Sequence, residues 1–445
     1  MSCERLFVSC IDELYHLSVY AFDPYRHVVY THSLRSMNFN QNPPAKPAEY
    51  KKSQIRGDED NLTRQKEMSI DESSLSSFQA IIGPWYESLE NPQKAQEKVL
   101  RTLLKEYNKT EYGSTFHATE IGGIPQYQSS FPTVSYQQLL PYIAKVREGN
   151  YQAFLSEPPE CWVMTRGSTG ASKVLPATKT HLKQIFSCGA RALVHHAART
   201  ENFDVFAGDI LNLNFPSSVH SMTRDGKEET YGYSSGTYAK ANPMFDRVSL
   251  LPRQEEIDQL GAGIGKADWE KRFELAYQKG VNHNVTATMG VTPVITAFGR
   301  YVKKKHGKTP GELWKFKALF CTSVPKIQFK YAPMLRKYFG AAPIVEMYTA
   351  TEGVFAQQFD DLPYITPNYD GYLFEVETSK GTKMLHELKR GEWGRLIISS
   401  TMLPRYDIGD MIEAAGKNYF RVFGRRNFQT LLEHRLFRLF FGWQL

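Results

Sequence analysis

A run of glycines and hydroxyl residues at positions 165–173 is the part of this 445-residue sequence best suited to holding phosphate groups. Gly167 and Gly170 allow the backbone to turn sharply and to bring N–H groups close to an anion. Hydroxyl donors and a cation at the exit complete the stretch, at Thr165, Ser168, Thr169, Ser172 and Lys173. Phosphates need many donors and a positive charge, so the stretch predicts a phosphate-binding loop. A polar turn between a strand and a helix is the alternative.

A second glycine-rich stretch, at 261–266, is not expected to bind phosphates. The P-loop of kinases and GTPases requires G-x-x-x-x-G-K followed by Ser or Thr. Here no glycine stands at the upstream position, and Ala267 follows the lysine. We expect a surface loop.

An aromatic ring, hydroxyls and a carboxylate follow a candidate strand at 348–352. At a strand end, Thr351 and Glu352 could serve one phosphate and one Mg²⁺, because magnesium prefers a few carboxylates together with phosphate oxygens. The ring of Tyr348 could flank a purine. The alternative is that Thr351 caps a following helix.

A third group pairs an acidic residue with a downstream arginine. Asp410 follows Gly409, and Arg425 follows Gly424. A carboxylate after a glycine can accept both hydroxyls of a ribose, and an arginine can reach ribose or phosphate. The alternative is a hairpin turn with a surface ion pair.

Apolar runs precede these residues and predict the elements that position them. Runs at 162–164, 319–321 and 343–347 read as strands that end just before the polar residues. Strands, turns and helical patterns alternate from Cys161 onwards, which predicts an α/β fold. Helical spacing predicts helices within 78–104. Closely spaced strands at 372–377, 394–400, 411–414 and 419–423 predict an antiparallel or barrel-like subdomain.

Composition divides the chain into three expected parts. Residues 1–75 read as an atypical extension and linker with poor order, because 36–74 is rich in charge and proline and poor in core formers. Met68 within it is a candidate translation start. Residues 76–425 are expected to form the large domain. Residues 426–445 read as a truncated tail, apolar and without a partner to bury it.

The bulk properties exclude several classes. The net charge of +7 is mild, and no dense basic stripe suggests nucleic acid as a partner. The five cysteines are scattered and form no C-x-x-C pair, which argues against a zinc knuckle or a disulfide scaffold and favours the cytoplasm. No apolar run approaches the about 20 residues needed to cross a bilayer, so no membrane partner is expected.

The order and spacing of the three groups resemble the signature motifs of the adenylate-forming (ANL) superfamily. Within it, the chain is similar to the Gretchen Hagen acyl-acid amido synthetases, which conjugate auxin and jasmonate to amino acids in plants. In that family the motifs read Ser-Ser-Gly-Thr-Ser/Thr-x-x-x-Lys, Tyr-x-x-Ser/Thr-Glu and Tyr-Arg-x-Gly-Asp. Here they stand at 165–173, 348–352 and 406–410, and the lead-in at 132–143 is also similar. The resemblance runs from about Met68 to Arg425.

Three features depart from the family pattern. Arg166 replaces a small hydroxyl residue, and Asp407 stands where arginine is usual. The resemblance further implies that the family's C-terminal domain, which moves over the site for the second half-reaction, is missing or truncated here.

The resemblance implies a fold and an activity. The fold would be an α/β large N-terminal domain, with β-sheets flanked by helices and a small β-subdomain, and with the C-terminal domain missing or truncated. The activity would be formation of an acyl-adenylate from a carboxylic acid with ATP and Mg²⁺, followed by amide formation with an amino acid or amine. One alternative is an acyl-CoA ligase of the phenylacetate–CoA ligase type. The other is a catalytically incomplete nucleotide-binding protein.

The resemblance also implies roles for individual residues. The loop would bind phosphates, Thr351 the α-phosphate and Glu352 the Mg²⁺, so that Lys173, Thr351 and Glu352 are the expected catalytic residues. Adenine and ribose would lie against Ser323, Val324, Tyr348, Asp410 and Arg425. The acid would bind among residues 211–238 and 285–298, which mix apolar residues with glycine and hydroxyls.

Overall fold

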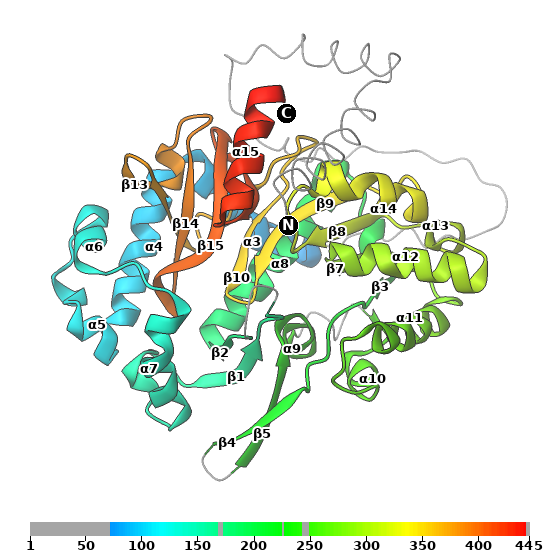
Figure 1. Cartoon of the computed structure of the whole chain (residues 1–445), viewed down its shortest axis with the longest axis horizontal. Helices are drawn as coiled ribbons and strands as arrows, with labels where there is room; N and C mark the ends of the chain where they lie inside the picture. Colours follow the sequence, from blue (N-terminus) through cyan, green and yellow to red (C-terminus); the bar gives the residue numbers. More distant parts are fainter. Residues whose placement is uncertain (1–71, 168–171, 225–226, 243–248, 442–445) are drawn as a thin grey trace, which may run out of the picture. The chain divides into compact units, whose positions relative to one another are not determined.

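The computed structural model of the chain describes residues 72–167, 172–224, 227–242 and 249–441, which all belong to one unit (Figure 1). Almost all of the expected N-terminal extension, Met68 included, lies outside these residues. So do Ser168, Thr169 and Gly170 at the centre of the predicted loop.

Helices come first among the described residues, as the sequence predicts. In α4, Asn91 accepts a hydrogen bond from the Lys94 N–H, and proline occupies the first turn, where its missing N–H costs nothing. The side-chain amide of Gln96 donates to the carbonyl oxygens of Tyr369 and Tyr372, which fixes α4 to the sheet behind it. The helical elements of this region are α3 (Glu72–Glu90), α4 (Pro92–Tyr107), α5 (Glu111–Thr115), η1 (Ala118–Glu120), α6 (Ile124–Ser130), α7 (Tyr136–Arg147) and η2 (Tyr151–Ala153).

A four-stranded sheet carries the predicted phosphate loop. Its order is β2-β1-β5-β4, with β1 (Pro159–Met164), β2 (Val174–Thr178), β4 (His220–Arg224) and β5 (Lys227–Tyr233). β1 and β2 are antiparallel, with Met164 opposite Val174, so the loop joins two strands of a hairpin. The alternative of a turn between strand and helix is therefore wrong. The next helix, α8 (Lys179–Thr200), begins only after Thr178, whose hydroxyl accepts from the His181 N–H.

A seven-stranded sheet of order β11-β10-β9-β8-β7-β3-β6 forms the α/β body. β6, β3, β7, β8 and β9 are parallel, and β10 and β11 continue antiparallel from β9. β8 is buried along its whole length, as expected of a parallel strand covered on both faces. The strands are β3 (Asp209–Leu211), β6 (Leu250–Leu251), β7 (Val285–Val291), β8 (Ala318–Thr322), β9 (Ile344–Ala350), β10 (Gly353–Gln357) and β11 (Thr366–Pro367).

Helices connect these strands and flank the sheet, with α12 running beside β7 (Figure 1). The glycine-rich stretch at 261–266 ends in the first residue of α11, and its Ile264 is exposed, as expected of a surface loop. The helical elements are η3 (Asp204–Phe206), α9 (Ser234–Ala241), α10 (Gln254–Asp258), α11 (Lys266–Gly280), α12 (Thr292–His306), α13 (Pro310–Leu313), the π-helix η5 (Ile327–Tyr331) and α14 (Ala332–Phe339).

The C-terminal strands form a five-stranded antiparallel sheet, which confirms the predicted subdomain. Its order is β13-β12-β14-β15-β16. Its elements are β12 (Leu373–Thr378), β13 (Gly381–Met384), η6 (Leu385–Glu387), β14 (Trp393–Ser400), β15 (Leu403–Gly416) and β16 (Tyr419–Arg425). The α/β fold with a small β-subdomain is confirmed.

The expected tail is a helix, α15 (Phe428–Phe441), drawn in red beside the end of β15 in Figure 1. The expectation that nothing buries it is only partly met. Phe428 is 81% exposed. His434, however, is buried and stacks on Phe423 of β16, with ring centroids 4.0 Å apart.

Two apolar clusters hold the described elements together. The larger joins the N-terminal helices to the five-stranded sheet and to one side of the seven-stranded sheet, and the smaller packs α11, α12 and α14 against the other side. Within the described residues, no helix is both long and apolar enough to span a membrane.

Candidate active site

The base of the predicted phosphate loop is closed by its own first and last residues. The N–H of Thr165 donates to the Lys173 carbonyl, and the N–H of Lys173 donates to the Thr165 hydroxyl oxygen, both at 2.9 Å. That hydroxyl keeps its own proton to donate. Gly167 has a φ of +67°, a conformation that favours glycine. The Tyr136 hydroxyl accepts from the Val174 N–H at 2.9 Å, which fixes the start of β2.

Lys173 points from this loop to residues of the two other sheets. Its Nζ donates to the hydroxyl of Tyr406 on β15 at 2.7 Å and lies 3.7 Å from Oε1 of Glu352. Tyr406 in turn donates to Glu352 Oε1 at 3.2 Å. Tyr406 is fully buried and Glu352 is 5% exposed. The loop, the β9–β10 turn and β15 therefore meet at one ammonium and one carboxylate.

Thr351 and Glu352 form the tight turn between β9 and β10, so the alternative in which Thr351 caps a helix is wrong. The Thr351 hydroxyl lies 2.9 Å from the hydroxyl of Ser234, the first residue of α9. The Tyr238 hydroxyl donates to the Thr351 carbonyl at 2.7 Å. The turn is thus held by α9 as well as by its own strands.

Asp410 and Arg425 lie opposite each other on β15 and β16, with Asp410 Oδ1 2.8 Å from Arg425 Nε. Oδ2 of the same carboxylate accepts from the Tyr348 hydroxyl at 2.6 Å. Asp410 is buried, whereas the Arg425 side chain is 45% exposed. The alternative of a hairpin turn with a surface ion pair is wrong in both respects, since the residues lie within strands and the carboxylate is covered.

Burial raises the pKa of Asp410, and the charge of Arg425 opposes this shift. Desolvation by itself lowers the pKa of Arg425, but Asp410 and, with it, Tyr348, Glu352 and Tyr406 raise it, so that its net shift is upward. The pKa of Tyr348 is raised well above its usual value by burial and then by Asp410. Arg425 and the Tyr348 hydroxyl therefore favour the ionised form of Asp410, and burial opposes it.

Ser323 and Val324 directly follow β8, at the end of the strand next to β9. Ser323 has a φ of +77°, so the chain turns sharply there. The hydroxyls of Thr322 and Thr349 lie 2.6 Å apart and tie the ends of β8 and β9 together. Contact of Ser323 and Val324 with an adenine stays a prediction.

The two departures in the motifs have identifiable surroundings. Asp407 pairs with Arg395 of β14 at 2.7 Å and accepts the Gly409 N–H through its other oxygen at 2.9 Å. A local arginine thus neutralises the acidic substitution. The guanidinium carbon of Arg166 lies over the ring of Phe215, 5.4 Å from its centroid.

Four residues of this site were given no individual role from the sequence, although two of them lie in the segment 211–238 expected to bind the acid. They are Tyr136, Ser234, Tyr238 and Tyr406. Each is brought to a motif residue by tertiary packing from a distant part of the chain. In the sequence, Tyr406 stands at the head of the third motif and Tyr136 in the lead-in at 132–143, but neither position indicates these contacts.

The potential metal ligands of this site suit a magnesium ion that also binds a nucleotide better than a metal ion bound by protein side chains alone. Among the residues that the structure describes, no three His, Cys, Asp or Glu side chains form a metal-binding group. Mg²⁺ commonly takes one or two carboxylates, with phosphate oxygens and waters filling its other positions. The single buried carboxylate of Glu352 beside the phosphate loop fits that demand.

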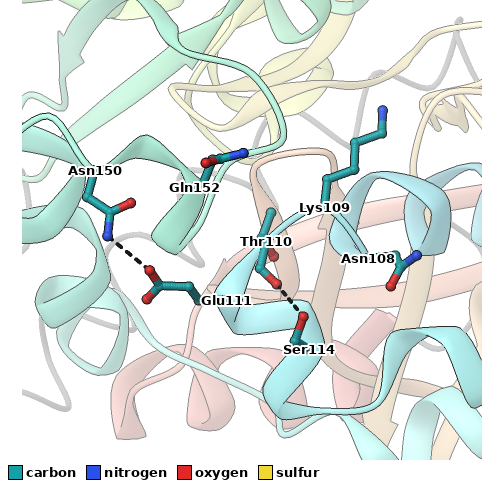
Figure 2. A pocket seen from close by; sticks show the side chains of 7 residues that line it. All are labelled: Asn108, Lys109, Thr110, Glu111, Ser114, Asn150 and Gln152. Carbon is teal, nitrogen blue, oxygen red and sulfur yellow. Dashed lines mark hydrogen bonds between the residues drawn. The ribbon is translucent and has the colours of Figure 1, made fainter.

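A separate hollow of about 520 Å³ lies over α5 and the end of α4. None of the residues predicted to bind nucleotide lines it. Figure 2 shows two hydrogen bonds in its lining: Asn150 donates to the Glu111 carboxylate at 3.0 Å, and the Ser114 hydroxyl donates to the backbone carbonyl of Thr110 at 3.0 Å. Its lining is Asn108, Lys109, Thr110, Glu111, Ser114, Asn150 and Gln152. All of these residues are polar, so the hollow lacks the mostly apolar lining of a typical small-molecule site.

Comparison with known proteins gives similarities in both sequence and fold. Residues 84–263 match the family model described as the GH3 family N-terminal domain. Over 98 residues the chain is 31% identical to the indole-3-acetic acid-amido synthetase GH3.2 of Arabidopsis thaliana; the alignment spans 22% of this chain and 18% of that protein.

Among solved structures, the chain is similar to the acyl acid amido synthetase AtGH3.15 in complex with 2,4-DB. The TM-score is 0.65 at 15% identity, over 79% of this chain and 71% of the other. A 2-hydroxyisobutyryl-CoA ligase in the postadenylation state has a TM-score of 0.50 at 12% identity, over 84% of this chain and 74% of the other. At these identities the likeness shows a common fold.

Proposed function

We propose that this chain, whose residues 84–263 match the GH3 family N-terminal domain, activates a carboxylic acid with ATP and then transfers the acyl group to an amine or amino acid. The observation that carries the proposal is the meeting of three motifs from three sheets. Lys173 lies against Glu352, and Asp410 accepts a hydrogen bond from Tyr348, four residues before Glu352 on the same hairpin.

In the first step, an oxygen of the acid's carboxylate forms a bond to the α-phosphorus of ATP. The bond between the α-phosphorus and the bridging oxygen to the β-phosphate breaks, and pyrophosphate leaves. Catalysis of such a transfer is mainly positioning and neutralisation of charge. Lys173 and the hydroxyls of Thr165, Ser168 and Thr169 would bind the phosphates. Gly167 and Gly170, which have no side chain, would let the backbone N–H groups approach them.

Two further residues act on the nucleotide in this proposal. Glu352 would hold a Mg²⁺ ion, which when bound would offset the negative charge of the phosphates. Thr351 would donate its hydroxyl to the α-phosphate, because Ser234 already fixes that hydroxyl in the turn.

The nucleoside would be held from the other side. Asp410 would accept the ribose hydroxyls, and Arg425 would keep that carboxylate ionised while reaching the ribose or a phosphate. Ser323, Val324 and Tyr348 would lie against the adenine. Asp410 is suited to this role because its two oxygens are already oriented by Arg425 and Tyr348.

In the second step, the amine nitrogen attacks the acyl carbon. The bond from that carbon to the AMP oxygen breaks, AMP leaves, and the nitrogen loses a proton. The cytoplasm is the proposed compartment, since Cys161, Cys188 and Cys321 are free thiols and scattered free thiols suit a reducing environment.

Pyrophosphate exchange tests the first step. The full chain is incubated with ATP, Mg²⁺, labelled pyrophosphate and a panel of carboxylic acids that includes indole-3-acetate. We expect at least one acid to drive label into ATP. If no acid does so while ATP still binds, the chain is a nucleotide-binding protein without this activity.

The second step is tested with an acid that passes the first. Amino acids and coenzyme A are added in separate reactions, and the products are separated by mass. An amide product supports the proposal, and a thioester supports an acyl-CoA ligase. The fold that the chain shares with a CoA ligase is why the second reaction belongs in the test.

A further inference from the structure

Arg166 is a cation of the candidate site that the proposed function leaves without a task. It directly follows Thr165, the first residue of the phosphate loop, and its side chain is exposed. Within the described parts of the chain, no carboxylate forms an ion pair with it; its one recorded partner is the ring of Phe215. An arginine with hydrogen-bond donors left over beside a catalytic loop is a candidate ligand for an anion.

The charged side chains of the site include more cations than carboxylates. Lys173 is paired with Glu352 and Arg425 with Asp410. The described residues of the site thus include three cations and two carboxylates. The pKa of Arg166 is lowered first by desolvation of its guanidinium and then by the charge of Arg425, so the two guanidinium groups repel each other. A bound anion would relieve that repulsion.

The side-chain contacts of Arg166 differ from those of the other two cations of the site. Lys173 and Arg425 contact Glu352 and Asp410, on the nucleotide side. The guanidinium of Arg166 lies over Phe215 instead. Phe215 belongs to the segment 211–238 expected to bind the acid, and it packs edge-on against Trp269, with ring centroids 4.8 Å apart. Arg166 therefore contacts an aromatic residue of the acid segment and lies close enough to Arg425 to be repelled by its charge.

We propose that Arg166 binds the reacting carboxylate of the acid substrate and holds it between Phe215 and the nucleotide. The proposal rests on the proposed function and adds a substrate-binding residue to it. The planar guanidinium pairs with a carboxylate through two parallel hydrogen bonds, which fixes the orientation of the carboxylate as well as its position. Because one face of the guanidinium lies on Phe215, the N–H groups at its edge are free to bind the carboxylate.

Kinetics with matched variants test the proposal. In Arg166→Ser the guanidinium is replaced by the kind of residue that the family motif carries. We expect KM for the acid in pyrophosphate exchange to rise about 10- to 100-fold, the effect of losing a hydrogen-bonded ion pair, with KM for ATP unchanged. Arg166→Lys should be intermediate because it keeps charge without the bidentate geometry. Arg147→Ser is the control, since Arg147 also lies over a ring, that of Trp162, at 5.3 Å.

An equilibrium measurement keeps the test independent of catalysis. Binding of indole-3-acetate and of its neutral analogue indole-3-acetamide is measured by tryptophan fluorescence, with further acid and amide pairs if neither binds. We expect the wild-type chain to prefer the acid, and Arg166→Ser to lose that preference while keeping its affinity for the amide. A wild-type chain that never prefers an acid over its amide would overturn the proposal, whether or not exchange occurs.

The kinetic result distinguishes the remaining possibilities. If Arg166→Ser raises KM for ATP and leaves KM for the acid unchanged, Arg166 binds phosphate and the proposal is wrong. If neither constant changes, Arg166 binds no substrate. Absence of exchange with every acid, together with a preference for acid over amide that depends on Arg166, would refute the proposed function and retain this inference.

Discussion

The ammonium of Lys173 lies 3.7 Å from the carboxylate of Glu352, and the Tyr406 hydroxyl contacts both groups. The lysine comes from the β1–β2 loop, the glutamate from the β9–β10 turn and the tyrosine from β15. A cation proposed for phosphate and a carboxylate proposed for magnesium are thus neighbours. Nucleotide and metal would have to enter between partners that already neutralise each other.

Glu352→Gln is expected to abolish acid-dependent pyrophosphate exchange in Mg²⁺. The amide of Gln keeps the shape of the side chain but loses the charge that would hold the ion. Losing one electrostatic contact of this kind commonly lowers the reaction rate by about a hundredfold or more. Exchange rate and thermal unfolding are measured together. Glu352→Asp, which keeps the charge, is the control and should retain part of the activity. Wild-type exchange in Glu352→Gln would remove Glu352 from the metal role.

Tyr406→Phe is expected to raise the Mg²⁺ concentration needed for half-maximal exchange. Without its hydroxyl, Lys173 and Glu352 lose the group that spaces them, and the lysine can compete more strongly for the carboxylate. The control is Tyr127→Phe, which removes another fully buried hydroxyl, 3.0 Å from the Ser399 hydroxyl and outside this site. Both variants should lose about 1 kcal/mol of stability. An equal Mg²⁺ dependence in the two would make Tyr406 merely structural.

Local signals in the sequence were enough to predict much of the framework. The apolar run at 319–321 became β8, and the last apolar residues at helical spacing within 78–104 became the buried face of α4. Both elements are specified by their own residues, through burial and capping. The three motifs were found for a related reason, because each lies in one short segment.

Other features depend on packing between distant segments. β15 runs for 14 residues, whereas the sequence predicted only 411–414, because Asp407 and Gly409 are typical of turns. Here Arg395 of the neighbouring strand pairs with Asp407, so the strand continues. The β1–β2 hairpin was missed because Pro176 and the helical pattern after it concealed a five-residue strand. The bridging role of Tyr406 arises only when β15 meets the loop.

Asp410→Asn is expected to raise KM for ATP about tenfold or more, because a charged hydrogen-bond acceptor for the ribose is lost. A substrate comparison makes the prediction specific. The wild-type chain should use 2′-deoxy-ATP much less well than ATP, and Asp410→Asn should use the two almost equally. If the variant still discriminates as strongly as the wild type, Asp410 does not contact the ribose hydroxyls. Asn has the same shape as Asp, and its side-chain oxygen can still accept the hydrogen bond from Tyr348, so the variant is expected to fold.

His195 is expected to make the protein less stable in mild acid. It is buried between α3 and the segment after β10, with Nδ1 2.7 Å from the Tyr86 hydroxyl and Nε2 2.6 Å from the Phe359 carbonyl. Burial lowers its pKa to about 4, and the charge of Arg199 adds to this effect. The neutral tautomer with a proton on Nε2 satisfies both contacts, since Tyr86 can donate to Nδ1.

In the unfolded chain the same group has a pKa of about 6.5. As the pH falls below that value the unfolded state takes up the proton first, so the full stability is present above about pH 6.5 and declines towards pH 4. For this single group the loss amounts to about 3 kcal/mol at pH 4. Urea unfolding at pH 8, 6 and 4 measures it. His195→Gln should be less stable at pH 8 and should show a shallower decline, whereas His220→Gln, which changes an exposed histidine of β4, should follow the wild type. Parallel declines in His195→Gln and the wild type would show that other buried groups cause the acid sensitivity.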